Sequence, residues 1–169
     1  MILATDTQYG DDTALSAGVL FSKWTSDKVD HCIIKTIDKI EPYQSGSFYK
    51  RELPCILALL DDIHEQLEVI VIDGFVNLGH EAKDGLGMRL YDAIDRSTQI
   101  IGVAKKAFIN TPKVCQLLRG TSQKPLFVTS VGIPLNDAKN HVKMMHGQNR
   151  IPTQLKKVDQ LCRGIICAG

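Results

Sequence analysis

A run of β-branched apolar residues near the middle of the chain predicts a strand that is buried on both faces. Residues 67–72 read Leu-Glu-Val-Ile-Val-Ile and stop at Asp73-Gly74. Because this run hardly alternates between apolar and polar positions, it is typical of the centre of a sheet covered by helices. Asp73 then lies at the carboxyl end of the strand, the edge at which open α/β sheets bind ligands. Asp-Gly is also common turn chemistry, so position alone leaves a purely structural role open.

The N-terminal part of the chain predicts three strands in an antiparallel meander. We expect them at residues 2–7, 14–21 and 28–37, joined by short turn segments such as Gly10-Asp11-Asp12. Consecutive strands with such short connections pair as hairpins. Asp6 lies on the first of these strands.

The first predicted helix follows a loop that begins near residue 41. Its apolar positions recur at intervals of three and four residues, at Leu53, Ile56, Leu57, Leu60 and Ile63. Pro54 is compatible only with the first turn. Glu52 is therefore expected at the amino end of the helix, where the dipole favours a carboxylate. A Glu that only complements the dipole is the alternative to a site role.

The central strand is followed by a predicted loop at 76–84, a helix at 85–94 and a strand at 99–104. A strand, helix and strand in this order predict a right-handed parallel crossover. The second parallel strand ends on Lys105-Lys106, so cations are expected at the edge of the sheet that carries Asp73. A solvated strand end is the alternative for Lys105.

The C-terminal third predicts one more strand and two amphipathic helices. Residues 108–124 are expected to be irregular, with a short helix at 114–118, and a strand is expected at 125–129. The two helices are marked by apolar residues at helical spacing, at Leu135, Ala138, Val142 and Met145 and, after Pro152, at Leu155, Val158 and Leu161.

These elements predict an α/β fold whose sheet has five or six strands, three antiparallel and the rest parallel, with helices on both faces. This layout resembles the ribonuclease H-like fold. Asp6, Glu52 and Asp73 are remote in sequence, but they converge in that topology.

Length and composition favour one domain over residues 1–169, because 169 residues with 44% hydrophobic content can form one sizeable core. No apolar run approaches the roughly 18 residues of a membrane span, and no targeting segment is recognisable. Five cysteines without a C-x-x-C pair argue against a disulfide framework or zinc site. We therefore expect a soluble, cytoplasmic protein with reduced thiols.

Charge is distributed unevenly although the net charge is only +1. Residues 1–99 contain 9 basic and 17 acidic side chains, whereas residues 100–169 contain 11 basic and 2 acidic ones. A metal-dependent enzyme that acts on a polyanion needs carboxylates for cations and Lys or Arg for phosphates. Chance segregation of solvated surface charge is the alternative.

The three converging carboxylates predict a site for divalent cations. Like charges within a few ångströms raise each other's pKa, which bound cations relieve. Mg²⁺ takes oxygen ligands from one or two carboxylates and from substrate phosphate. Two such ions, about 3.5–4 Å apart, can clamp the attacking and leaving oxygens of a displacement at phosphorus. This is the chemistry of a nuclease.

Five short motifs occur in order along nearly the whole chain: Ala4-Thr5-Asp6-Thr7-Gln8-Tyr9, Tyr43-Gln44-Ser45-Gly46 followed by Glu52-Leu53-Pro54, Ile72-Asp73-Gly74, Ile101-Gly102-Val103-Ala104-Lys105, and Arg150-Ile151-Pro152 with Asp159. In order and spacing they resemble the motifs of the endonuclease V family, nucleases that cleave next to deoxyinosine or inosine. The fourth motif matches the family pattern without a change.

The resemblance implies that Asp6, Glu52 and Asp73 bind Mg²⁺, for which Mn²⁺ can substitute. It implies that Lys105 contacts the phosphate or orients the attacking water. Tyr43 would be a wedge that stacks into the gap left by a displaced base; an aromatic ring packed on the core is the alternative. The remaining substrate contacts expected are Gly46, His80 and Lys106.

Some positions depart from the family pattern. His80 lies one residue further along than the family histidine and is followed by Glu81-Ala82 instead of Pro-Arg. Ser130-Val131-Gly132-Ile133 replaces Ser-Pro-Gly-His, and the wedge loop lacks Ile-Pro. We therefore expect a short, divergent member that retains the catalytic residues more fully than those that recognise the lesion.

The leading hypothesis is a metal-dependent endonuclease that hydrolyses DNA or RNA near deoxyinosine, inosine or another damaged base. The resemblance implies products with a 3′-hydroxyl and a 5′-phosphate. A non-cleaving nucleic-acid-binding module on the same scaffold is the alternative, although it would gain nothing from three carboxylates facing phosphate. An actin-like phosphotransferase would need a duplicated domain and a Gly-rich phosphate motif. The choice of strand and base and the oligomeric state stay open; a monomer is compatible with the sequence.

Overall fold

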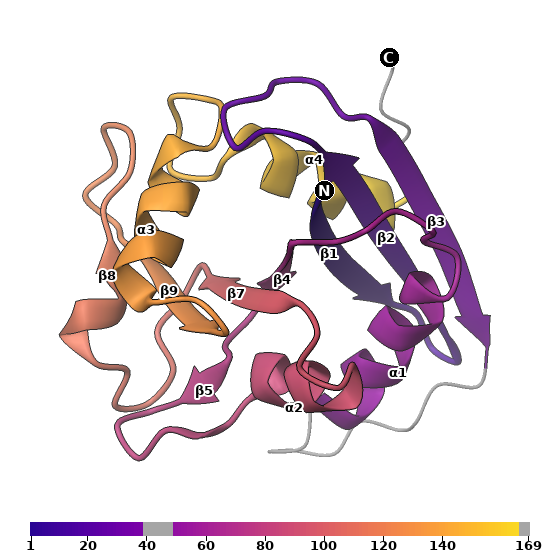
Figure 1. The fold of residues 1–169 in the computed structure, drawn as a ribbon, viewed down its shortest axis with the longest axis horizontal. Coiled ribbons are helices and arrows are strands. Elements are labelled where there is room, and N and C mark those ends of the chain that lie inside the picture. The colour runs from indigo at the N-terminus through magenta and orange to yellow at the C-terminus, as the bar shows by residue number, and fades with distance from the viewer. Residues whose placement is uncertain (39–48, 166–169) are drawn as a thin grey trace.

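The computed structural model describes residues 1–38 and 49–165 and is built on one seven-stranded sheet (Figure 1). The strands lie in the order β3-β2-β1-β4-β7-β9-β8. Their bounds are β1 Ile2–Tyr9, β2 Thr13–Phe21, β3 His31–Asp38, β4 Val69–Asp73, β7 Gln99–Ala104, β8 Gln116–Leu117 and β9 Leu126–Val131. No helix within the described ranges has the length and apolarity needed to cross a membrane.

The strand directions confirm the predicted meander and crossover. β1 pairs antiparallel with β2 and β2 with β3, while β1 and β4 run parallel, as do β4 and β7. The predicted size of the sheet, five or six strands, was wrong, and so was the parallel direction of its last part. β9 is antiparallel to β7 and to β8. Residues 105–125, between β7 and β9, contain a short 3-10 helix, η1 (Lys113–Cys115), and the two-residue strand β8. They contain no α-helix, the element that usually carries the chain back to form a parallel strand.

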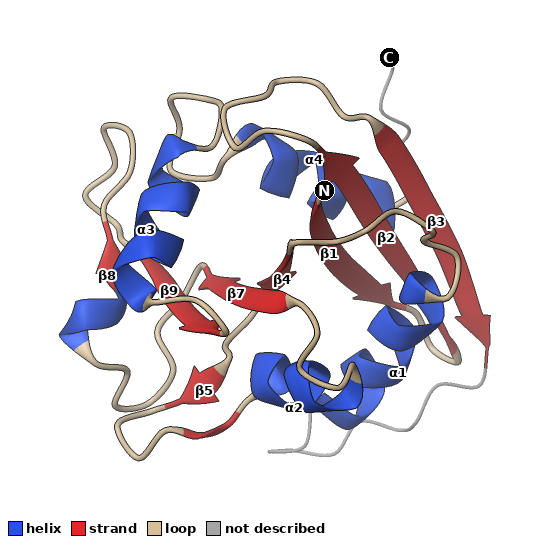
Figure 2. Ribbon diagram, viewed as in Figure 1, coloured by secondary structure: helices blue, strands red, loops and turns tan. Residues whose placement is uncertain are grey.

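Helices cover both faces of the sheet, as predicted (Figure 2). α1 (Tyr49–Leu60) and α2 (Leu86–Ala93) pack on one face, and α3 (Leu135–Met144) and α4 (Thr153–Cys162) on the other. Each face has its own hydrophobic core: the first core lies under α1 and α2, and the second under α3 and α4. Ile70 and Ile72 of the central strand β4 belong to the first core, whereas Val69 and Val71 belong to the second. Successive side chains of a strand point to opposite faces, so an unbroken apolar run is what two covered faces require.

Helix α1 begins earlier than predicted, so the expectation that Pro54 lies in its first turn was wrong. The helix starts at Tyr49, so Pro54 lies in its interior. The Arg89 guanidinium lies 3.8 Å from the centre of the Tyr49 ring, and Tyr49 packs against the first core. These contacts extend the helix upstream, although the missing N–H of an interior proline costs a helical hydrogen bond. Glu52 still falls in the first turn.

Two further segments differ from the predictions. The expected loop at 76–84 contains a small two-stranded sheet, in which β5 (Asn77–Leu78) pairs with β6 (Lys83–Asp84). The expected helix at 114–118 is replaced by η1 and strand β8. Gln116 and Leu117 pair there with β9, so sheet pairing overrides a weak local helical preference.

Two buried or half-buried side chains fix the elements around the strand ends. Gln154 of α4 is fully buried, and its Nε2 donates to the carbonyls of Ser26 and Lys28, at 2.9 Å each. Arg150 donates to the carbonyl of Lys105 and, at 2.8 Å, to that of Pro125. The first set of contacts holds α4 to the β2–β3 connection, and the second joins the end of β7 to the start of β9.

We predict that Gly102→Ala destabilises the fold. A Cβ at Gly102 would lie 2.6 Å from the Gly74 carbonyl oxygen and 2.7 Å from Thr129 Oγ1. The Thr129 hydroxyl accepts a hydrogen bond from the N–H of Val76 at 2.8 Å, so the added methyl group also disturbs the segment after Asp73. Overpacking of this kind costs about 1–3 kcal/mol. Chemical denaturation should show this loss, and an unchanged free energy of unfolding would contradict it.

Candidate active site

Four predicted site residues line one hollow at the carboxyl ends of β1, β4 and β7. Asp6 comes from β1, and Asp73 is the last residue of the neighbouring parallel strand β4. Lys105 follows β7, and Glu52 reaches the hollow from the first turn of α1. We call this the acidic hollow; its lining is Asp6, Thr7, Gln8, Tyr9, Glu52, Asp73, Lys105, Asp159 and Arg163.

Two carboxyl groups of the acidic hollow, those of Asp6 and Glu52, resist ionisation. Burial raises the pKa of Asp6 to about 6, with a further contribution from the charge of Asp73. The N–H of Thr7 donates to Asp6 Oδ1 at 2.8 Å and opposes this shift. Glu52 is only 5% exposed, and burial, together with Asp6 and Asp73, raises its pKa well above the usual value. The hollow therefore favours a bound cation or a bound proton.

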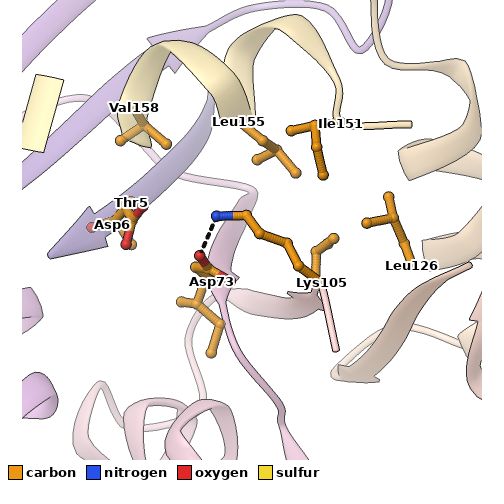
Figure 3. Close-up of a pocket in the computed structure, with 10 residues that line it drawn as sticks. Thr5, Asp6, Asp73, Lys105, Leu126, Ile151, Leu155 and Val158 are labelled. Carbon is orange, nitrogen blue, oxygen red and sulfur yellow. Dashed lines mark hydrogen bonds and ion pairs between the residues drawn. The ribbon is translucent and has the colours of Figure 1, made fainter. Parts of the chain in front are cut away.

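Lys105 supplies positive charge at this site. Its Nζ donates to Asp73 Oδ2 at 2.8 Å and to Asp159 Oδ1 at 3.3 Å. Figure 3 shows the ammonium group of Lys105 directed at Asp73. Lys105 also lines a neighbouring pocket together with Leu126, Ile151 and Leu155. Burial by itself lowers the pKa of Lys105, but the hydrogen bond and charge of Asp73 outweigh it and raise the pKa.

Two residues near the C-terminal end of α4, Asp159 and Arg163, line the acidic hollow but were not predicted as site residues. Asp159 Oδ1 contacts Lys105 Nζ and, at 3.1 Å, Arg163 Nη2. Two signals were available: Asp159 is one of two acidic residues after position 100, and it lies four residues before an arginine on a helix, a spacing at which side chains meet.

The two predicted substrate contacts that the structure describes, His80 and Lys106, are not part of the lining of the acidic hollow. Tyr43 and Gly46 belong to residues 39–48, which are outside the described residues. His80 is exposed in the turn between β5 and β6 and lines a separate hollow with Phe108 and Ile109. Lys106 is exposed next to Lys105. The roles of all four as substrate contacts stay predictions.

The donor set suits a hard divalent cation, because carboxylate oxygens are the ligands that Mg²⁺ prefers. Burial and neighbouring charge raise the pKa values of Asp6 and Glu52, and a bound cation would offset the cost of ionising them. Within residues 1–38 and 49–165, no three His, Cys, Asp or Glu side chains are arranged to hold one ion. In this arrangement Asp73 pairs with the Lys105 ammonium instead.

We predict that Asp6→Asn stabilises the protein in the presence of EDTA. The pKa of Asp6 rises from 3.8 to about 6 on folding, so the folded state binds more protons and the free energy of unfolding falls as pH increases from about 4 to 6. Asn keeps an oxygen that accepts the Thr7 N–H but carries no charge. At pH 8 the variant should be more stable by about 1–3 kcal/mol. Urea titrations at several pH values test this, and equal stability of the two proteins at pH 8 would contradict it.

Comparison with known proteins places the chain in a family. The family model of endonuclease V matches residues 1–131. Endonuclease V of Streptomyces avermitilis is 29% identical over 186 residues, which cover 96% of this chain and 79% of that protein. Endonuclease V of Pyrococcus horikoshii is 27% identical over 167 residues, covering 98% and 74%.

Solved structures agree with this assignment. The crystal structure of the Streptomyces avermitilis protein superposes with a TM-score of 0.74 at 27% identity, over 96% of this chain and 79% of that one. Endonuclease V of Ciona intestinalis, solved with a 24-mer DNA that contains an inosine followed by a ribo-adenosine, has a TM-score of 0.78 at 20% identity and covers 96% and 84%. The fold is thus the predicted α/β, ribonuclease H-like one, and the chain belongs to the endonuclease V family of nucleases.

Proposed function

We propose that this protein is a metal-dependent endonuclease that hydrolyses phosphodiester bonds of DNA or RNA next to deoxyinosine or inosine. The observation that carries the proposal is the convergence of Asp6, Glu52 and Asp73 in one hollow beside Lys105. Family membership supports the nuclease chemistry. The inosine-containing DNA bound by the Ciona intestinalis relative supports the substrate class.

Asp6, Glu52 and Asp73 would hold Mg²⁺, or Mn²⁺ in its place. When bound, such an ion neutralises charge on the phosphate and lowers the pKa of a coordinated water. Asp6 is oriented for this role by the N–H of Thr7, and Glu52 by its burial beneath the hollow. The raised pKa values of both carboxyls support the proposal, because a cation offsets the cost of ionising them.

Lys105 would donate from its ammonium group to a non-bridging oxygen of the scissile phosphate. Its side chain is 39% exposed while its Nζ is held by Asp73 and Asp159, so it can exchange a carboxylate for a phosphate oxygen without a large movement. Its pKa is raised, which keeps it protonated at neutral pH. Lys105 therefore serves as a donor in this proposal rather than as a general base.

The remaining contacts extend the proposal along the strand. His80 and Lys106 are exposed on the side of the β5–β6 hairpin and the end of β7, where they would meet nucleotides flanking the cleavage position. Tyr43, with Gly46 in the same segment, would fill the gap left by a displaced base. That residues 1–169 form one domain, and that the protein is cytoplasmic, also stay predictions.

A non-cleaving nucleic-acid-binding protein is the second candidate. The observation that favours it is the pairing of Lys105 with both Asp73 and Asp159, which neutralises charge at the centre of the hollow without an ion. Substitution of Asp73 distinguishes the two candidates. In a nuclease Asp73 takes part in the chemistry, whereas in a binding protein its charge only repels the phosphates of the strand.

We predict that Asp73→Asn loses cleavage but keeps its fold and its affinity for nucleic acid. Removing a ligand of the catalytic ion should lower kcat by about 100-fold or more, which corresponds to about 3 kcal/mol of transition-state stabilisation. Single-turnover cleavage of an inosine-containing oligonucleotide with Mg²⁺ measures this loss. Asp137→Asn is the matched control, since Asp137 is exposed on α3. Normal cleavage by Asp73→Asn would contradict the assignment of the metal ligands.

We also predict that cleavage depends on inosine and on a divalent cation. Matched single-stranded DNA and RNA oligonucleotides, with and without one inosine, would be incubated with Mg²⁺, Mn²⁺ or EDTA. We expect a cut next to inosine only where a cation is present. Equal cleavage of the oligonucleotides with and without inosine would support nuclease activity but contradict the preference for inosine. Binding of every strand without cutting would favour the second candidate.

A further inference from the structure

A second positively charged side chain, that of Arg163 at the end of α4, lines the acidic hollow. Among the described residues that line the hollow, Lys105 and Arg163 are the two that carry a positive charge. Lys105 is bound between two carboxylates, whereas the side chain of Arg163 is 57% exposed. Arg163 follows α4 directly and forms its C-terminal cap. It therefore stands at the rim of the hollow, while Lys105 stands at its centre.

The contact between Arg163 and Asp159 orients the guanidinium rather than stabilising the helix. An exposed i,i+4 ion pair contributes only about 0.3–0.5 kcal/mol. Asp159, however, is just 25% exposed and its Oδ1 also accepts a hydrogen bond from Lys105, so it is fixed from two sides. The hydrogen bond from Arg163 Nη2 to this oxygen, at 3.1 Å, holds a flexible side chain against the wall of the hollow.

A guanidinium held in this way is suited to a phosphate. It carries five N–H donors in a planar fork, and Asp159 is contacted by one nitrogen of that fork, Nη2. Arginine binds phosphate bidentately, with charge-assisted hydrogen bonds that are stronger than neutral ones. The hollow also contains four carboxylates, which repel a polyanion, so a strand that enters it needs positive charge at the rim.

The position of Arg163 relative to the carboxylates indicates which phosphate it would meet. Lys105 forms an ion pair with Asp73. In the proposed reaction, Lys105 is therefore the residue that contacts the scissile phosphate. Arg163 ends α4, which packs on β1 and β2, and it lines the hollow together with Thr7, Gln8 and Tyr9 from the end of β1. A strand that leaves the centre of the hollow on the β1 side passes Arg163.

Resting on the proposed function, we propose that Arg163 binds the backbone phosphate adjacent to the scissile one, and that Asp159 positions its guanidinium for this contact. The ligand is a non-bridging phosphate oxygen of DNA or RNA, and the contact carries no base specificity. Phosphate contacts of this kind fix the register of a nucleic acid on a protein. Arg163 would therefore help to decide which bond lies over the carboxylates.

The test replaces single phosphates of an inosine-containing strand by neutral methylphosphonates, one position at a time. Binding is measured with Mg²⁺ in the Asp73→Asn background, with and without Arg163→Ala. With Arg163 present, the neutral linkage next to the cleavage position should weaken binding about tenfold. With Arg163→Ala, the same linkage should cost less than about twofold, and the slope of log K against log salt should fall by about 0.7–1.

Two control variants separate this contact from general charge effects. Lys156→Ala removes an exposed charge from the same helix outside the lining of the acidic hollow, so it should leave the tenfold effect at that linkage unchanged. Arg163→Lys keeps the charge but not the fork, and should retain the salt slope while losing part of the position-specific effect. Denaturation curves establish that each variant is folded.

The possible outcomes distinguish this inference from the proposed function. An equal cost of the neutral linkage with and without Arg163, at every position, would overturn the phosphate contact. Coupling at the scissile linkage itself would overturn the assignment to its neighbour. Wild-type protein is assayed for cleavage of the unmodified strand in parallel: cleavage without coupling rejects only the role of Arg163, whereas binding without cleavage rejects the proposed function.

Discussion

The constraint on which the site depends is the burial of carboxylates close to one another at the ends of β1 and β4 and the start of α1. Burial and Asp73 raise the pKa of Asp6 to about 6, and burial also raises that of Glu52. A protein without such a site would replace these side chains by apolar or neutral polar ones, because crowded, buried like charges cost free energy. The rest of the fold therefore holds these carboxylates together. The ion pairs of Asp73 and Asp159 with Lys105 offset only part of the free-energy cost of crowding them.

The fold meets this cost with a rigid frame around the strand ends. The central strands are packed on both faces by two separate cores. Arg150 joins the carbonyl of Lys105 to that of Pro125, and Gln154 holds α4 against the β2–β3 connection. Because α4 carries Asp159, its attachment fixes a second carboxylate on Lys105. Side chains without a chemical role thus determine the distances on which the chemistry depends.

Hydrophobic periodicity predicted the parts of this frame that one segment specifies by itself. The apolar run of β4 and the helical spacing in α3 and α4 sufficed to predict these elements. The parallel ends of β1 and β4 then brought Asp6 and Asp73 together. The direction of β9 was not predictable in this way, because the irregular residues before it carry no period. β5, β6 and β8 are two residues long, too short for a pattern. The contact of Asp159 with Lys105 arises when α4 packs on β1 and β2, which no local signal encodes.

Lys105 links the electrostatics of the hollow to the proposed chemistry. Its ammonium group makes its contacts with Asp73 and Asp159, and a phosphate oxygen in the hollow would compete with both carboxylates for the same donor. Exchange becomes favourable only when other positive charge replaces Lys105 beside Asp73, because an unpaired carboxylate in this position is costly. Binding of cation and binding of strand are then mutually reinforcing. The ion pair between Lys105 and Asp73 thus compensates charge that a bound cation would otherwise neutralise.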